Sequence, residues 1–174
     1  MINFLNGTRE NRYEICFDLK DVSIIAAKIA GSVSSFVKST HMIETALQEA
    51  IYNAIEHGNL EITREKKREL INNSKFDEFL EEKISSQKNC KRKVYILSIV
   101  SNDALRVEIE DEGKGFDWKK ELDILKSEKG SLLEKYSGFG LKIILEAFDE
   151  VIYNEKGNKL ILVKYLCQKN REKR

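Results

Sequence analysis

The sequence contains no proline, only nine glycines and only three cysteines among its 174 residues. The cysteines, Cys16, Cys90 and Cys167, are odd in number and widely spaced, which excludes a disulfide framework and a C-x-x-C metal pattern. No apolar run approaches the roughly eighteen residues of a membrane-spanning helix, and the first residues lack a signal-peptide pattern. We therefore expect a cytoplasmic protein with reduced cysteines and no membrane partner.

Net charge is also nearly absent, because 30 Lys and Arg residues are balanced by 29 Asp and Glu residues. A broad nucleic-acid footprint needs concentrated positive charge, whereas candidates such as residues 91–93 and 169–174 are only short basic stretches. Direct nucleic-acid binding is therefore not expected. The proportions of charged residues (34%) and hydrophobic residues (41%) are typical of a globular protein, and the length favours a single domain over residues 1–174.

Hydrophobic periodicity predicts the order of the secondary-structure elements. Alternating or continuous apolar runs predict strands, and apolar residues at helical spacing predict helices. The expected strands are 12–18, 94–100, 105–110, 151–154 and 160–166, and the expected helices are 21–37, 40–57 and one that follows Ser137. This order predicts an α+β fold: a two-layer α/β sandwich with a mixed, mostly antiparallel sheet covered on one face by helices.

A charged insert at about residues 61–93 interrupts this pattern, because 17 of its 33 residues are charged. Phe76, Phe79, Leu80 and Ile84 form one short amphipathic stripe within it. We expect two helices that use this stripe to dock on the sheet edge or on a second subunit, which leaves a homodimer open. On this interpretation the insert helps to choose partners and makes no contact with a ligand of the main domain.

A first polar cluster lies on the second predicted helix, where Glu49, Asn53 and His57 follow each other at four-residue spacing and Gly58 ends the helix. A carboxylate at such a site can accept a proton, and a carboxamide oxygen can ligate a hard cation such as Mg²⁺. A solvated polar stripe would show the same spacing, so this cluster alone does not identify a site.

A second cluster follows a predicted strand and comprises Asp111, Gly113, Gly115 and Phe116. A carboxylate at the strand end can accept a hydrogen bond from the exocyclic amine of adenine, whereas guanine presents an acceptor at the same place. The glycines would let the backbone approach the base. An ordinary Asp/Gly turn is the alternative.

A third cluster, Ser137 to Leu141, opens the last predicted helix with Gly138, Phe139 and Gly140. Free backbone N–H groups at a helix start can bind an anion, although simple helix capping would also explain these residues. Neither a Walker loop nor a Rossmann fingerprint is present at this point.

In this order the three clusters resemble the nucleotide-binding boxes of the gyrase, heat-shock chaperone, histidine-kinase and mismatch-repair ATPases. More narrowly, the chain is similar to the anti-sigma-factor serine/threonine kinases of bacterial partner-switching systems. Glu49, Asn53 and the His57-Gly58-Asn59 ending match the N-box, the Asp111 cluster matches the adenine box, and the Gly138 cluster matches the lid box. The resemblance covers nearly the whole chain.

The resemblance implies a histidine-kinase-like ATPase fold that binds ATP and Mg²⁺, with a mobile lid near residues 116–140. It implies that Asn53 holds Mg²⁺, that Asp111 reads adenine and that Glu49 is the catalytic base. The residues that it places around ATP are Asn53, His57, Gly58, Asp111, Gly113, Gly115, Phe116, Gly138, Phe139, Gly140 and Leu141.

The implied activity is phosphorylation of a serine or threonine on a small anti-sigma-factor antagonist, with a sigma factor as a further partner. The alternative is an ATP-dependent binding module that sequesters a regulator without significant kinase activity. Glu49 favours the kinase.

Overall fold

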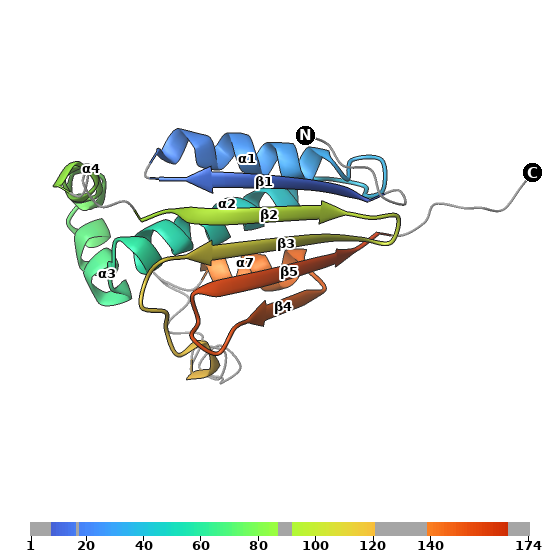
Figure 1. The fold of residues 1–174 in the computed structure, drawn as a ribbon. Coiled ribbons are helices and arrows are strands. Elements are labelled where there is room, and N and C mark those ends of the chain that lie inside the picture. The colour runs from blue at the N-terminus through green and yellow to red at the C-terminus, as the bar shows by residue number, and fades with distance from the viewer. Residues whose placement is uncertain (1–7, 17, 87–91, 121–138, 167–174) are drawn as a thin grey trace, which may run out of the picture.

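The computed structural model describes residues 8–16, 18–86, 92–120 and 139–166 (Figure 1). Within these ranges the chain forms five strands that belong to one sheet, and the helices pack beside it. In chain order the elements are β1 (Arg9–Ile15), α1 (Leu19–Gly31), α2 (His41–Asn53), η1 (Ala54–Asn59), α3 (Arg64–Asn72), α4 (Phe76–Ser86), β2 (Val94–Val100), β3 (Ala104–Asp111), α7 (Phe139–Ala147), β4 (Glu150–Tyr153) and β5 (Lys159–Tyr165).

The strands lie in the order β1-β2-β3-β5-β4, and every neighbouring pair is antiparallel. A mixed sheet was expected, and the described strands contain no parallel pair. Parallel neighbours need a crossover that returns the chain to the same end of the sheet. Here β2 begins beside the end of β1, with Val94 opposite Ile15, so the two strands run in opposite directions.

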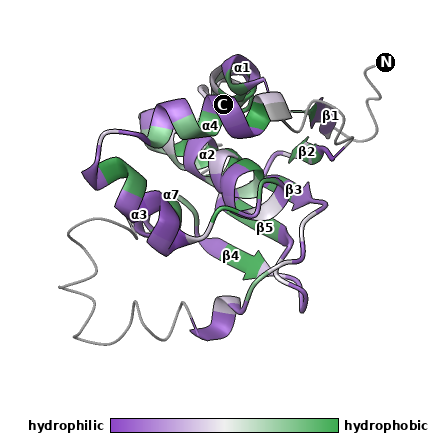
Figure 2. Ribbon diagram, turned by 90° about the vertical axis from the view of Figure 1, so that its left-hand side faces the viewer, coloured by the Kyte–Doolittle hydropathy of each residue, from purple (hydrophilic) through white to green (hydrophobic). Residues whose placement is uncertain are grey.

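Helices α1, α2 and α7 cover one face of the sheet (Figures 1 and 2). Alternation along the strands explains this arrangement, because every second residue of β2 and β3 is buried. The buried positions of β3 are Leu105, Val107, Ile109 and Asp111. Asp111 therefore faces the helices, at the end of a row of core residues. The α+β sandwich is confirmed.

Helix α1 begins and ends earlier than the apolar pattern predicted. The carboxylate of Asp18 caps the helix by accepting a hydrogen bond from the Lys20 N–H at 3.0 Å. The helix ends at Gly31, and the Ser32 hydroxyl donates a hydrogen bond to the Ile29 carbonyl. Residues 32–38 continue as turns, although Val33 in them is still fully buried.

Helix α2 was expected to run as a regular helix to His57, but residues from Ala54 to Asn59 form the π-helix η1. The Leu60 N–H donates to the carbonyl of Ile55, five residues back, at 2.8 Å. Short π-helical segments occur frequently at functional sites. The wider turn changes the direction in which His57 and its neighbours face.

The insert forms the two expected helices, α3 and α4, at the end of the molecule that faces the viewer in Figure 2. The side chain of Leu80 is buried in the hydrophobic core, and Phe76, Phe79 and Ile84 are partly buried against that core. The amphipathic stripe thus docks on the core of its own chain. In the part of the chain that the structure describes, no helix combines the length and apolar character needed to span a membrane.

Candidate nucleotide-binding site

A cleft of about 450 Å³ opens where α2 and η1, the start of the insert, the end of β3 and the β4–β5 hairpin meet. This volume falls within the range of about 300–1,000 Å³ that is typical of small-molecule sites. Predicted site residues that line it are Asn53, His57, Gly58, Asp111, Gly115, Phe116 and Leu141. Phe139 and Gly140 begin α7, whereas Gly138 and most of the expected lid lie outside the described residues.

Asp111 brings the first and second clusters together. Its side chain is buried, and its carboxylate accepts a hydrogen bond from the Gly113 N–H at 2.8 Å. A Cβ atom on Gly58 would overlap that carboxylate, so the helix backbone and Asp111 touch only because position 58 is glycine. Burial raises the pKa of Asp111 to about 6. At neutral pH the cleft therefore presents a desolvated carboxylate, which is a strong acceptor for an N–H donor.

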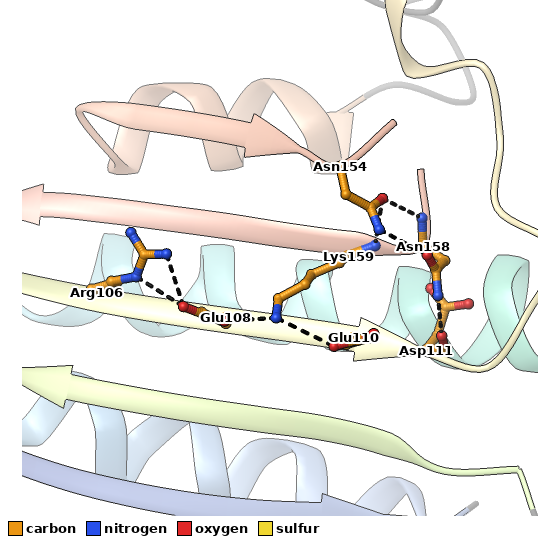
Figure 3. A network of polar contacts seen from close by, with 7 residues as sticks. All are labelled: Arg106, Glu108, Glu110, Asp111, Asn154, Asn158 and Lys159. Carbon is orange, nitrogen blue, oxygen red and sulfur yellow. Dashed lines mark hydrogen bonds and ion pairs between the residues drawn. The ribbon is translucent and has the colours of Figure 1, made fainter. Parts of the chain in front are cut away.

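The last hairpin holds the backbone of Asp111 in place (Figure 3). The buried Asn158 side chain donates from Nδ2 to the Asp111 carbonyl at 2.6 Å, and the Asp111 N–H donates to the Asn158 carbonyl at 2.9 Å. Asn154 Oδ1 in turn accepts hydrogen bonds from the N–H groups of Gly157, Asn158 and Lys159. The spacing of Asn154 and Asn158 gave no sign that these residues support Asp111.

Replacing Asn158 by alanine is expected to lower stability by about 1 to 3 kcal/mol, because the Asp111 carbonyl loses a buried donor. ATP affinity should fall as well, by about tenfold, because Asp111 is no longer held at the cleft. Arg106→Ala is the control, since Arg106 pairs with Glu108 outside the cleft. Thermal unfolding and titration calorimetry measure the two effects. Unchanged ATP affinity in a destabilised Asn158→Ala variant would reduce Asn158 to a purely structural role.

Aromatic side chains form one wall of the cleft. Phe116 and Tyr153 line it and pack edge to face with ring centroids 5.2 Å apart. Trp118 also stacks on Tyr153, with ring centroids 5.9 Å apart, and its Nε1–H donates to the Asn154 carbonyl at 3.0 Å. Burial raises the pKa of Tyr153 to about 12, so this hydroxyl stays neutral. Such a wall suits a flat heteroaromatic base. Phe116 was predicted from the sequence as a site residue, whereas Tyr153 and Trp118 were not.

The first and third clusters also meet. A Cβ atom on Gly140 would overlap Glu49 Oε2 and would lie 3.7 Å from Asn53 Nδ2. With glycine at position 140, the first turn of α7 approaches these two side chains closely, and a larger residue there would displace the end of the Glu49 side chain. The Glu49 carboxylate and the Asn53 carboxamide thus lie beside the backbone of the first turn of α7.

The start of the insert is part of the cleft, contrary to the expectation that the insert stays apart from it. Residues 61–65 all line the cleft. Glu61, whose φ of 52° is unusual for a residue other than glycine, pairs with Arg92 at 2.8 Å and with Lys114 of the adenine-box loop at 2.9 Å. Lys93, of the same basic stretch as Arg92, pairs with Glu14. These two cations are therefore engaged within the fold.

Metal binding by this chain would depend on few side chains. Within the described ranges no group of three or more His, Cys, Asp or Glu residues could hold a cation. Mg²⁺ commonly uses one or two protein ligands together with the oxygens of a bound phosphate. Asn53, at the cleft and beside Gly140, fits this limited role.

An acidic acceptor in an aromatic-walled cleft, with a carboxamide and a glycine-opened helix start beside it, defines a site of the nucleotide-binding ATPase class. The chain belongs to the family described as histidine kinase-like ATPase domain, whose model matches residues 18–164. Domains of this family bind ATP, typically with Mg²⁺. A search of curated proteins found no match.

Proposed function

We propose that this protein is an ATP-dependent serine/threonine kinase that phosphorylates a small anti-sigma-factor antagonist in a bacterial partner-switching circuit. The observation that supports it most directly is the position of Glu49. This carboxylate lies on α2 beside Gly140 and one helical turn from Asn53. Hydrolysis of ATP needs a base or an orienting group for water, and transfer to a protein needs the same group for a hydroxyl.

The proposed division of labour follows from the residue types. Asn53 would hold Mg²⁺ beside the nucleotide, and the bound cation would offset negative charge on the transferring phosphoryl group. The substrate hydroxyl oxygen bonds to the γ-phosphorus as the bond to the ADP oxygen breaks. Its proton passes to the Glu49 carboxylate. Asp111 accepts a hydrogen bond from the exocyclic amine of adenine, and the aromatic wall of Phe116 and Tyr153 contacts the base.

The test begins with partners captured from a lysate of the source cells in the presence of ATP or ADP. Each captured protein is then incubated with the purified protein and ATP labelled at the γ-phosphate. The expected product is a small labelled protein whose phosphate survives acid, because serine and threonine phosphates are acid-stable and histidine phosphate is not. Tight ATP and partner binding without transfer over hours would contradict the kinase and support the binding module.

A further inference from the structure

The first turn of α3 brings the insert to the cleft. Arg64 is the first residue of α3, and it lines the cleft together with Thr63 and Glu65. Thr63 caps this helix by accepting a hydrogen bond from the Lys66 N–H at 3.2 Å. Asn53 and His57, of α2 and η1, line the same cleft. A cationic side chain of the insert is thus placed in the space that also contains the predicted magnesium ligand.

The elements of the cleft themselves hold α3 in this position. Lys67, three residues after Arg64, forms an ion pair with the buried carboxylate of Glu56 in η1. The Lys67 ammonium also lies 5.2 Å from the centre of the Phe76 ring, which packs against the core. An ion pair with a buried member is costly to break, because the remaining charge is left without compensation. The start of α3 is therefore fixed to the helix that carries Asn53.

The charges around Arg64 favour an anionic ligand at this end of the cleft. Glu61 is neutralised by Arg92 and Lys114. Glu65 hydrogen-bonds a backbone N–H and the Thr63 hydroxyl at its own helix start, and the charges of Arg68 and Arg64 also lower the pKa of its carboxyl. The Arg64 charge acts on Tyr153 as well, because it opposes the rise that burial causes in the pKa of that hydroxyl.

We propose that Arg64 binds the phosphate groups of the nucleotide, so that the insert completes the ATP site. The planar guanidinium offers paired N–H donors that match phosphate oxygens. This inference deepens the proposed function and rests on it in one respect, namely that the cleft binds ATP. The insert then contributes a side chain to nucleotide binding, in addition to packing against the core.

The experiment compares ATP, ADP, AMP and adenosine by titration calorimetry on the full chain and on an Arg64→Ala variant. Loss of a charge-assisted contact should weaken ATP and ADP binding by about 10- to 100-fold. Adenosine binding should change by less than about twofold, because adenosine carries no phosphate. Arg64→Lys should give an intermediate loss, since a lysine keeps the charge but not the fork.

Lys66→Ala is the matched control. Lys66 lies on the same helix, pairs with Glu69 at 3.1 Å and does not line the cleft. The Lys66→Ala variant should bind every ligand of the series with the affinity of the parent. A uniform loss across the series in Arg64→Ala, adenosine included, or no loss at all, would overturn the proposal. If Arg64→Ala weakens ATP and ADP binding but the parent transfers no label to protein, the proposed kinase activity is wrong and the role of Arg64 stands. If the parent binds no nucleotide, both proposals are wrong.

Discussion

Replacing Glu49 by glutamine is expected to leave Mg-ATP binding intact and to slow phosphoryl transfer about 10²- to 10⁴-fold. A negative side chain does not assist the binding of a polyphosphate, so its removal should preserve or even tighten nucleotide binding. Glutamine keeps the shape beside Gly140 but cannot accept a proton from the attacking hydroxyl. Calorimetry with Mg-ATP, beside radiolabel transfer to the captured partner, measures the two properties separately.

Asn53→Ala provides the contrast, because loss of a magnesium ligand should weaken both binding and transfer. Glu44→Gln is the matched control on the same helix, since Glu44 neither lines the cleft nor lies beside Gly140, as Glu49 does. It should leave both properties unchanged. Transfer at the parental rate in Glu49→Gln would show that Glu49 is only part of a solvated helix face.

The elements that the sequence predicted best are those with a strong local pattern. The alternation of β3 identified its buried face, and the same alternation places Asp111 at the end of the buried row. The insert stripe of Phe76, Phe79 and Ile84 was also recognisable, because apolar residues at helical spacing need a surface to cover.

The structure departs from prediction where distant segments decide the outcome. The π-helix η1 begins inside a continuous helical pattern, and its neighbours across the cleft cannot be read from local spacing. Asn158 reaches Asp111 across 47 positions of sequence, and Lys67 reaches Glu56 across a turn of unusual backbone at Glu61. Periodicity reports which face of an element is buried, but not which polar side chain it meets.

In the candidate site, too, residues with a local sequence pattern were predictable and residues placed by distant contacts were not. Three short clusters were recognisable because each contains glycine beside a polar residue, and the structure explains the pairing. A side chain at Gly58 or Gly140 would overlap the carboxylate of Asp111 or Glu49. Arg64 and Tyr153 carry no such local mark, since a charged helix start and a strand tyrosine are common on any surface. Only the cleft that they share with Asn53 singles them out.

Asp111→Asn is expected to raise the stability of the nucleotide-free protein and to weaken its binding of ATP. The pKa of Asp111 is about 6 in the folded protein and 3.8 in an unperturbed chain. The folded state therefore holds the extra proton between these values, and the stability associated with it is lost as the pH rises through 6. Without nucleotide, Asp111→Asn should be more stable than the parent above pH 6, by about 1 to 2 kcal/mol. Two pKa units correspond to about 3 kcal/mol, and the open cleft beside the carboxyl reduces this.

Nucleotide binding should respond in the opposite sense. The ionised carboxylate accepts the adenine amine and repels the O6 acceptor of guanine, so the parent should prefer ATP to GTP at pH 7.5. This preference should weaken as the pH falls below about 6 and Asp111 is protonated. Asparagine supplies a donor as well as an acceptor, so Asp111→Asn should bind ATP about tenfold or more weakly and lose both the preference and its dependence on Asp111 ionisation. Because the phosphates of both nucleotides titrate alike, the ATP-to-GTP affinity ratio isolates the base-reading residue. Calorimetry of both nucleotides at pH 5.5 and 7.5 measures that ratio. Equal affinities in the parent at pH 7.5 would show that Asp111 does not read adenine.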